Sequence, residues 1–353
     1  MSTDLEKRHL QGRVKSVRSE TLEFEKQGDQ FNEKPWLVQT ECFDPEGRLS
    51  ETSFYNAQHP EYASRNTFAY DSTGRLAAES FCSGGRVTSN TQSLYDSENR
   101  LVQRVFVDGD GKAAGKADVI YDADGNKVEE SSYDAEGKLV AKTTYHPNGN
   151  RAEEAFFDYG EPEPNVSRGY SIDANPGYDH SFGGCGKAFL EKKVYDLNGY
   201  PAQLQLFDKI GNLLMRVIFT TDDAGRIVKD AMFAAFSLPE GAELPPEIAA
   251  LVSGEIPVSE GEIIYDAEGR KIEDRRSLGG ALFQTRAFKY DPRGDLIEDS
   301  TFNADGELQS RAQIKWEYDS KGNWIMKLVS GWNNETRTFE PSSIERREIK
   351  YHD

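Results

Sequence analysis

The chain has 353 residues and a formal net charge of −19, from 61 acidic and 42 basic side chains. This balance disfavours nucleic acid and anionic membrane surfaces as partners, because lysine and arginine must neutralise phosphate in both cases. Hydrophobic residues make up 37% of the chain, below the about 45–50% of ordinary globular proteins. This composition is typical of a polar protein rich in sheet and turn.

The start of the chain carries no targeting signal. The charges of residues 1–9 are not followed by an apolar run, and no stretch reaches the roughly 18 apolar residues of a membrane span. Cys42, Cys82 and Cys185 are odd in number and widely spaced, which favours a reducing compartment over a disulfide framework. We therefore expect a cytoplasmic protein.

A short phrase recurs along the chain: an aromatic residue, Asp, two variable residues, Gly, and then mostly a basic or amide residue. It occurs at 43–48, 70–75, 121–126, 133–138, 195–200, 265–270, 290–295 and 318–323. Other glycines, and Asn99 in the place of one, divide the chain into steps of about 11 to 14 residues. Short and longer steps mostly alternate, so the repeating unit is a pair of steps of about 25 residues.

Each step has the length of one strand and one turn. Asp favours the start of a type I turn and Gly supplies positive φ near its end, a conformation that Asn99 also tolerates. In a 12-residue step, a Leu or Ile two residues after the glycine, such as Leu139, shares one strand face with the aromatic residue six positions later, here Tyr145. This parity breaks in the 11-residue steps, where we expect bulges. We predict at least about 20 short antiparallel strands that pair in sequence.

The Tyr-Asp-x-x-Gly phrases resemble the YD-repeat (rearrangement-hotspot, RHS) family over roughly residues 40–325, and residues 10–17 are similar to the first strand of small bacterial members. The resemblance implies an antiparallel ribbon that coils into a curved sheet or hollow shell. In large members that shell encloses a C-terminal toxin, released at a self-cleaving aspartyl site. Here too few residues follow Gly322 for a toxin, and Asp44 and Asp291 lack the proline that precedes that site. The chain is therefore similar to a small stand-alone member.

We predict a single all-β domain in which a sequential antiparallel sheet coils into a curved ribbon or partial shell. Its parts are N-terminal cap strands at 1–42, repeats at 43–322 and a C-terminal cap hairpin at 323–353. Two loop insertions, at about 161–187 and 237–259, lengthen the glycine spacing. Insertions in repeat proteins map to loops on one face, often the binding face.

The first insertion gathers reactive side chains. His180 and Cys185 lie five residues apart, and a Cys–His pair can supply a nucleophile because the base lowers the cost of forming thiolate. The candidate catalytic residues are His180, Asp179, Cys185 and His146. The candidate ligand-binding residues are Tyr170, Tyr178, Asp179 and His180.

No metal or other cofactor is expected. Asp108 and Asp122 begin phrases that look like calcium loops, but Ala113 and Lys127 stand where an EF-hand loop requires glycine. We expect their carboxylates to accept N–H bonds within turns. The sequence contains no His-x-x-x-His and no Cys-x-x-Cys phrase.

Two classes of function fit this pattern. The first is a non-enzymatic binding or scaffold protein that uses the curved sheet and its insertions to hold a protein or carbohydrate partner. The second is an enzyme with a pocket where the 161–187 insertion closes over the sheet. A deep pocket lined by His146, Asp179, His180 or Cys185 would favour the enzyme, and a smooth face would favour binding.

Overall fold

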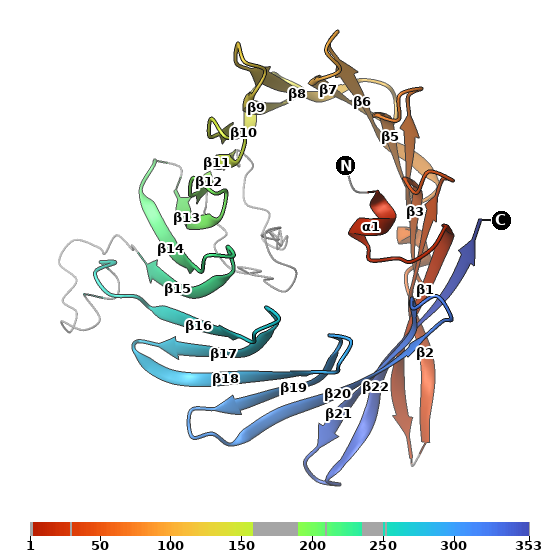
Figure 1. The fold of residues 1–353 in the computed structure, drawn as a ribbon, viewed down its shortest axis with the longest axis vertical. Helices are drawn as coiled ribbons and strands as arrows, with labels where there is room; N and C mark the ends of the chain where they lie inside the picture. The colour runs from red at the N-terminus through yellow and green to blue at the C-terminus, as the bar shows by residue number, and fades with distance from the viewer. Residues whose placement is uncertain are drawn as a thin grey trace. The chain divides into compact units, whose positions relative to one another are not determined.

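The computed structural model describes residues 3–28, 30–157, 190–208, 210–234, 250 and 253–352. In this part of the chain nearly all regular structure is strand, β1 to β22 (Figure 1). The helices described over their whole length are the four-residue α1 (Asp4–Lys7) and the 3-10 turn η1 (Pro60–Tyr62), and Ala250 is also helical. None of the described helices is long and apolar enough to cross a bilayer. The prediction of an all-β chain with at least about 20 antiparallel strands is confirmed.

The chain divides into two units. Unit 1 comprises Met1–Ala114, Phe288–Thr301 and Leu308–Asp353, and unit 2 comprises Gly115–Ala287 and Phe302–Glu307. The strands of unit 1 are β1 (Val14–Gln27), β2 (Gln30–Phe43), β3 (Leu49–Asn56), β4 (Ser64–Tyr70), β5 (Leu76–Ser83), β6 (Arg86–Tyr95), β7 (Leu101–Asp108), most of β19 (Leu296–Asn303), β20 (Leu308–Tyr318), β21 (Trp324–Asn333) and β22 (Thr338–Tyr351).

Unit 2 holds the middle strands. They are most of β8 (Ala113–Tyr121), β9 (Lys127–Asp134), β10 (Leu139–Tyr145), β11 (Arg151–Phe157), β12 (Leu190–Tyr195), β13 (Pro201–Phe207), β14 (Leu213–Thr221), β15 (Ile227–Ala234), β16 (Ser259–Tyr265), β17 (Lys271–Leu278) and most of β18 (Ala281–Tyr290). From β8 to β18 each strand pairs antiparallel with the next.

The aspartate of the repeated phrase builds the turn. At Asp71 the side-chain Oδ1 accepts the backbone N–H groups of Thr73 (2.9 Å) and Arg75 (3.0 Å). The Asp71 carbonyl accepts the N–H of Gly74 (2.9 Å), whose φ is +83°. The same pair of side-chain bonds recurs at Asp44, Asp96, Asp108, Asp122, Asp134, Asp196, Asp208, Asp222, Asp266, Asp291 and Asp319. The predicted turn role of Asp108 and Asp122 is therefore confirmed.

The sequence also predicted the left-handed positions and some of the bulges. Asn99 has a φ of +65° in the place of a glycine. Register shifts occur in two of the short steps, at Phe81/Cys82 and Arg276/Ser277. The sequence reasoning missed a second set of shifts, at the aromatic residue that precedes the aspartate, as at Ala69/Tyr70.

The basic residue of one repeated phrase contacts the tyrosine of the next, and this contact connects each such turn to the next turn but one. The Arg75 guanidinium lies 4.3 Å from the centre of the Tyr95 ring, and the Tyr95 hydroxyl donates to the Leu76 carbonyl at 2.9 Å. In unit 2 the Arg226 guanidinium lies 4.7 Å from the centre of the Tyr265 ring in the same way. Cation–π contacts of this kind stabilise neighbouring turns, so the most recognisable residues of the repeat serve the architecture.

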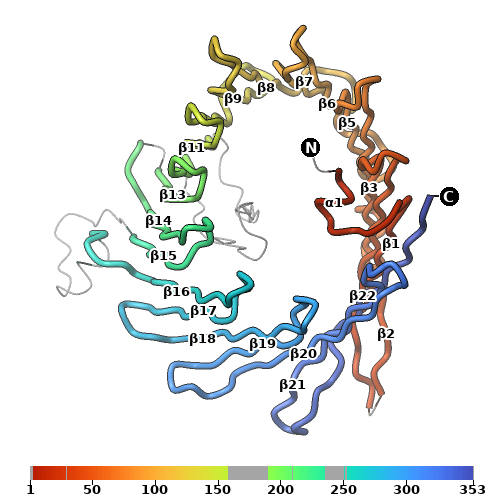
Figure 2. Tube along the Cα trace, in the orientation of Figure 1, coloured from red at the N-terminus to blue at the C-terminus, as the bar shows by residue number. Residues whose placement is uncertain are grey.

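The first and last strands are paired with each other. All 22 strands belong to one sheet, and in unit 1 β1 pairs antiparallel with both β2 and β22, so that Val17 lies opposite Glu41 and Ile349 (Figure 2). The sheet therefore closes on itself. The expected curved ribbon or partial shell, which would have left two free edges, is wrong. Exposed strand edges invite aggregation, and here the two segments expected to be caps pair with each other instead.

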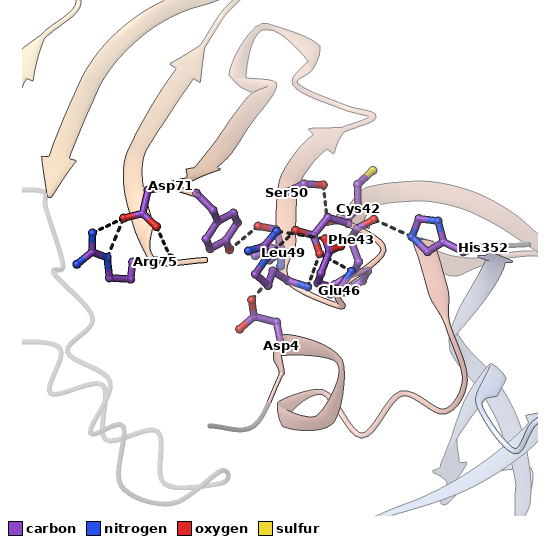
Figure 3. A network of polar contacts seen from close by, with 12 residues as sticks. Asp4, Cys42, Phe43, Glu46, Leu49, Ser50, Asp71, Arg75 and His352 are labelled. Carbon is purple, nitrogen blue, oxygen red and sulfur yellow. Dashed lines mark hydrogen bonds and ion pairs between the residues drawn. The ribbon is translucent and has the colours of Figure 1, made fainter. Parts of the chain in front are cut away.

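The segment before β1 reinforces this junction. Leu5 and Leu10 pack in one buried cluster with Val14, Phe43 and Leu49. The Asp4 carboxylate accepts the Leu49 N–H at 2.8 Å, and the His352 Nε2 lies 3.1 Å from the Phe43 carbonyl oxygen (Figure 3). The short N-terminal helix thus holds the β2–β3 turn against the end of β22.

The predicted C-terminal hairpin is present as β21 and β22. Its second strand begins at Thr338, and near this end Trp332 lies opposite Phe339, with their rings edge to face at 5.1 Å.

Substitution of a turn glycine tests the left-handed requirement. The φ of Gly137 is +80°, and an added Cβ would meet nothing within 4 Å. Gly137→Val should therefore destabilise the fold through backbone strain alone, by about 1 kcal/mol or more. Gly331→Ala is the control, since Gly331 also faces open space and needs no positive φ. Urea unfolding of both variants measures the effect, and equal stabilities would refute the assignment.

Acid should weaken the turns. The hydroxyl of Thr73 and the side chain of Arg75 hold the pKa of Asp71 below the ordinary 3.8, and backbone and side-chain bonds from Arg100 do the same for the pKa of Asp96. A depressed folded-state pKa gives stability that is complete above the unfolded pKa and is lost as pH falls toward the folded value. The melting temperature should thus fall below about pH 4, as followed by circular dichroism. A melting temperature unchanged down to about pH 2 would count against this.

Candidate functional site

Most of the sequence-predicted site residues lie outside the described residues. These are Tyr170, Tyr178, Asp179, His180 and Cys185, together with nearly all of the second insertion. His146 is described and takes the aspartate position of the β10–β11 turn, where its N–H donates to the Asn150 carbonyl at 2.8 Å. Its Nε2 atom is buried without a hydrogen-bond partner among the described residues.

A cluster of charged side chains lies on the two strands that border residues 158–189. In the register of β11 and β12, Glu154 is opposite Lys193 and Phe156 is opposite Glu191. Residues that alternate along a strand share a face, so Tyr195 lies on the same face as Lys193 and Glu191. We use the name β11–β12 cluster for five side chains: Arg151, Glu154, Glu191, Lys193 and Tyr195.

Hydrogen bonds satisfy one carboxylate of this cluster but not the other. The Tyr195 hydroxyl donates to Glu154 Oε2 at 2.5 Å, and Arg151 Nη1 lies 3.0 Å from Glu154 Oε1. Glu191 is 8% exposed, and its Oε1 has no hydrogen-bond partner among the described residues. The Lys193 ammonium is 3.5 Å away from that oxygen. A buried carboxylate oxygen in this state is ready to accept a donor from a ligand or from water.

Burial sets the protonation of the cluster. It raises the pKa of the Glu191 carboxyl, while the ammonium of Lys193 opposes the rise. Burial, followed by the bond to Glu154, also raises the pKa of the Tyr195 hydroxyl well above its usual range. Tyr195 therefore remains a hydrogen-bond donor at neutral pH, and Glu191 takes up a proton more readily than an exposed glutamate.

A second group of charges lies across β15, β16 and β17. The Arg276 Nη1 atom donates to both oxygens of Asp230, at 3.0 and 2.9 Å, and its Nε donates to Asp274 at 2.7 Å. Gly261 stands between Asp230 and Arg276 in the register. A Cβ at Gly261 would lie 2.3 Å from both Arg276 Nη1 and Asp230 Oδ2, so glycine leaves the space that this ion pair occupies.

An apolar cluster separates the two groups of charges on the same face of unit 2. The register connects Lys193 with Leu204, Leu204 with Val217, and Val217 with Met232. The buried members of this cluster are Leu204, Leu206, Met215, Val217, Phe219, Ile227 and Ile263. We call this surface, with the charges at either side, the mixed face of unit 2. Its charged parts lie on the strands next to the two insertions.

Sequence reasoning missed Arg151, Glu154, Glu191, Lys193 and Tyr195 as candidate site residues. One signal was available. Glu191 and Lys193 precede the repeat tyrosine Tyr195 by four and two residues, so they share its buried face by strand alternation. Burying a charged side chain costs free energy unless the charge is paired, so charged residues at buried strand positions indicate a candidate functional site.

The described residues contain no group of three His, Cys, Asp or Glu side chains arranged to hold a metal ion.

Comparison with solved structures finds fold-level likeness at low similarity. A chain of "Crystal Structure of TcdB2-TccC3-Cdc42" is 15% identical with a TM-score of 0.35, and the match covers 98% of this chain and 18% of that one. A porin-like protein from Bacteroides uniformis ATCC 8492 is 9% identical with a TM-score of 0.25, and the match covers 96% of both chains. The present chain thus spans less than a fifth of the TcdB2-TccC3-Cdc42 chain.

At these TM-scores the likeness carries no inference about function. No protein-family model matches the chain. No curated protein matches it either.

Gly261→Ala tests the ion pair that crosses this residue. The new Cβ would displace the Arg276 guanidinium from Asp230, and loss of one partner of a buried pair typically costs about 3–5 kcal/mol. We expect a loss of at least about 2 kcal/mol in urea unfolding. In an Arg276→Ala background the same change should cost less, because Arg276 Nη1, one of the two atoms that the new Cβ would meet, is then absent and no ion pair remains to be broken. Equal costs in the two backgrounds would contradict the steric explanation.

Proposed function

We propose that the chain is a non-enzymatic binding or scaffold protein that holds a protein or carbohydrate partner on the mixed face of unit 2, together with the 161–187 and 237–259 insertions. The observation that carries this proposal is the buried Glu191 Oε1 atom, which has an ion pair with Lys193 but no hydrogen-bond partner among the described residues. It lies on a face that a buried apolar cluster shares. Binding sites commonly combine a largely apolar lining with a few polar groups that fix orientation.

Closure of the sheet supports a face rather than an edge as the binding surface. A partner strand often adds to an exposed sheet edge, but β1 is paired on both sides. The Asp, Arg and Tyr side chains of the repeat are engaged in turns and stacks. The side chains of the mixed face and the longer connections beside it are the surfaces that we propose for a partner.

We further propose that the chain is a cytoplasmic member of the YD-repeat family. The Tyr-Asp-x-x-Gly phrase and the turn geometry at Asp71 and Gly74 support this relationship.

Arrays of defined peptides and oligosaccharides test the binding proposal. The wild-type chain should retain a chemically related set of probes, and Lys193→Met should weaken their binding at least about tenfold, because it removes a charge from the mixed face. Lys192→Met is the matched control, since Lys192 lies on the opposite face and pairs with Glu153 at 2.7 Å. Absence of any bound probe, or equal binding by the two variants, would contradict the proposal.

The alternative is an enzyme that uses Glu191 as a general acid, and the raised pKa of this carboxyl favours it. Chromogenic ester, glycoside and phosphate substrates can be screened with the wild type and Glu191→Gln. Turnover by the wild type that the variant loses would replace the binding proposal with this one.

A further inference from the structure

One arginine of unit 1 is largely covered and has no hydrogen-bonded partner among the described residues. Arg347 lies on β22 with its side chain 22% exposed, and its guanidinium is 3.4 Å from the centre of the Trp324 ring. The nearest carboxylate is that of Glu345, and the distance from Arg347 Nε to Glu345 Oε1 is 3.9 Å, beyond hydrogen-bond reach. The Nε atom is buried and has no partner among the described residues.

This state contrasts with that of two other arginines of unit 1. Arg48 donates to Asp44 at 2.6 Å, as the repeat requires. Arg346, the neighbour of Arg347 on the opposite face, holds Glu33 with two nitrogens at 2.8 and 2.5 Å. A guanidinium carries five N–H donors, and a largely buried charge without hydrogen bonds is costly. The terminal nitrogens of this partly exposed side chain are therefore the donors that an acceptor from outside the chain can reach.

The surroundings form a cationic patch with an aromatic wall. Lys327 lies opposite both Trp316 and Glu345 in the register, and Glu345 and Arg347 alternate along β22, so all four side chains share a face. The Lys327 ammonium is 5.4 Å from the centre of the Trp316 ring, and the Trp316 and Trp324 rings meet edge to face at 5.4 Å. Two cations and the Glu345 carboxylate share this face, in a chain whose net charge is −19.

Nearby acidic groups do not fill the site. Glu41 contributes to the field at Arg347, but its carboxylate already accepts a hydrogen bond from Arg8 at 2.8 Å. Burial lowers the pKa of Arg347, yet an arginine remains charged at neutral pH. An arginine binds a carboxylate or phosphate group through two parallel N–H···O bonds. The charged guanidinium of Arg347, held on the Trp324 ring, can form such a pair.

We propose that Arg347, stacked on Trp324 and assisted by Lys327, forms a binding site for an oxyanion, either a carboxylate or a phosphate group. This site lies in unit 1 and goes beyond the partner binding proposed for unit 2. Either proposal can fail without the other, because the variants that test them are different.

Tryptophan fluorescence of the full chain measures this binding directly. Sodium succinate supplies carboxylate and sodium phosphate supplies phosphate, each compared with sodium chloride at equal ionic strength. At least one of the two should give a saturable change in the wild type. Arg347→Lys, which keeps the charge but loses the fork, should weaken binding at least about tenfold. Arg347→Met should abolish the change, and Arg346→Met should leave it intact.

Thermal unfolding gives a second, independent readout. The effective oxyanion should raise the melting temperature of the wild type and of Arg346→Met, but not that of Arg347→Met. Should Arg347→Met fail to fold, Arg347→Lys carries the comparison. The proposal is overturned if neither anion gives a saturable response in the wild type, or if the response survives in the Arg347 variants. In the first case solvent alone satisfies the guanidinium.

Discussion

The hydrogen bonds from one aspartate carboxylate to the backbone of its own turn are the interaction on which this structure depends. At Asp71 a single oxygen accepts two N–H groups, and a glycine in the left-handed region lets the chain reverse. Because the turn is built from local contacts, it can recur along the chain without long-range support. The stacking of Arg75 on Tyr95 then connects one turn to the next but one, so local geometry becomes a continuous sheet.

This locality explains how much of the fold the sequence reveals. The Asp and Gly of the phrase indicate a turn, and the Leu after them indicates the start of a strand. The strand start at Leu76 and the left-handed conformation of Asn99 could therefore be predicted. Closure could not be predicted, because β1 and β22 lack the phrase and their pairing has no local signal. The extra register shifts, as at Ala69/Tyr70, were missed because one residue inserted at a turn leaves the glycine spacing unchanged.

The candidate site was less predictable for a different reason. Reactive residue types drew attention to His180 and Cys185, whereas the described cluster consists of ordinary residues such as Glu154 and Lys193. What distinguishes them is the face on which they lie, and face depends on register. Every bulge reverses the parity of the residues that follow it, so an error of one residue at a turn moves a charge from solvent to the buried side. The burial of Glu191 became apparent only with the register in hand.

The pairing of the first strand with the last has a consequence for synthesis and folding. Gln11 and Asn323 exchange hydrogen bonds although they are 312 positions apart, and β1 cannot complete its hydrogen bonds until β22 has been made. Such non-local pairing is slow to form, and a domain of this length emerges from the ribosome over tens of seconds. During that interval the nascent chain exposes one edge of β1. The charged residues along this strand, among them Lys15, Arg18, Glu20 and Glu23, protect it against pairing with a second chain in the meantime.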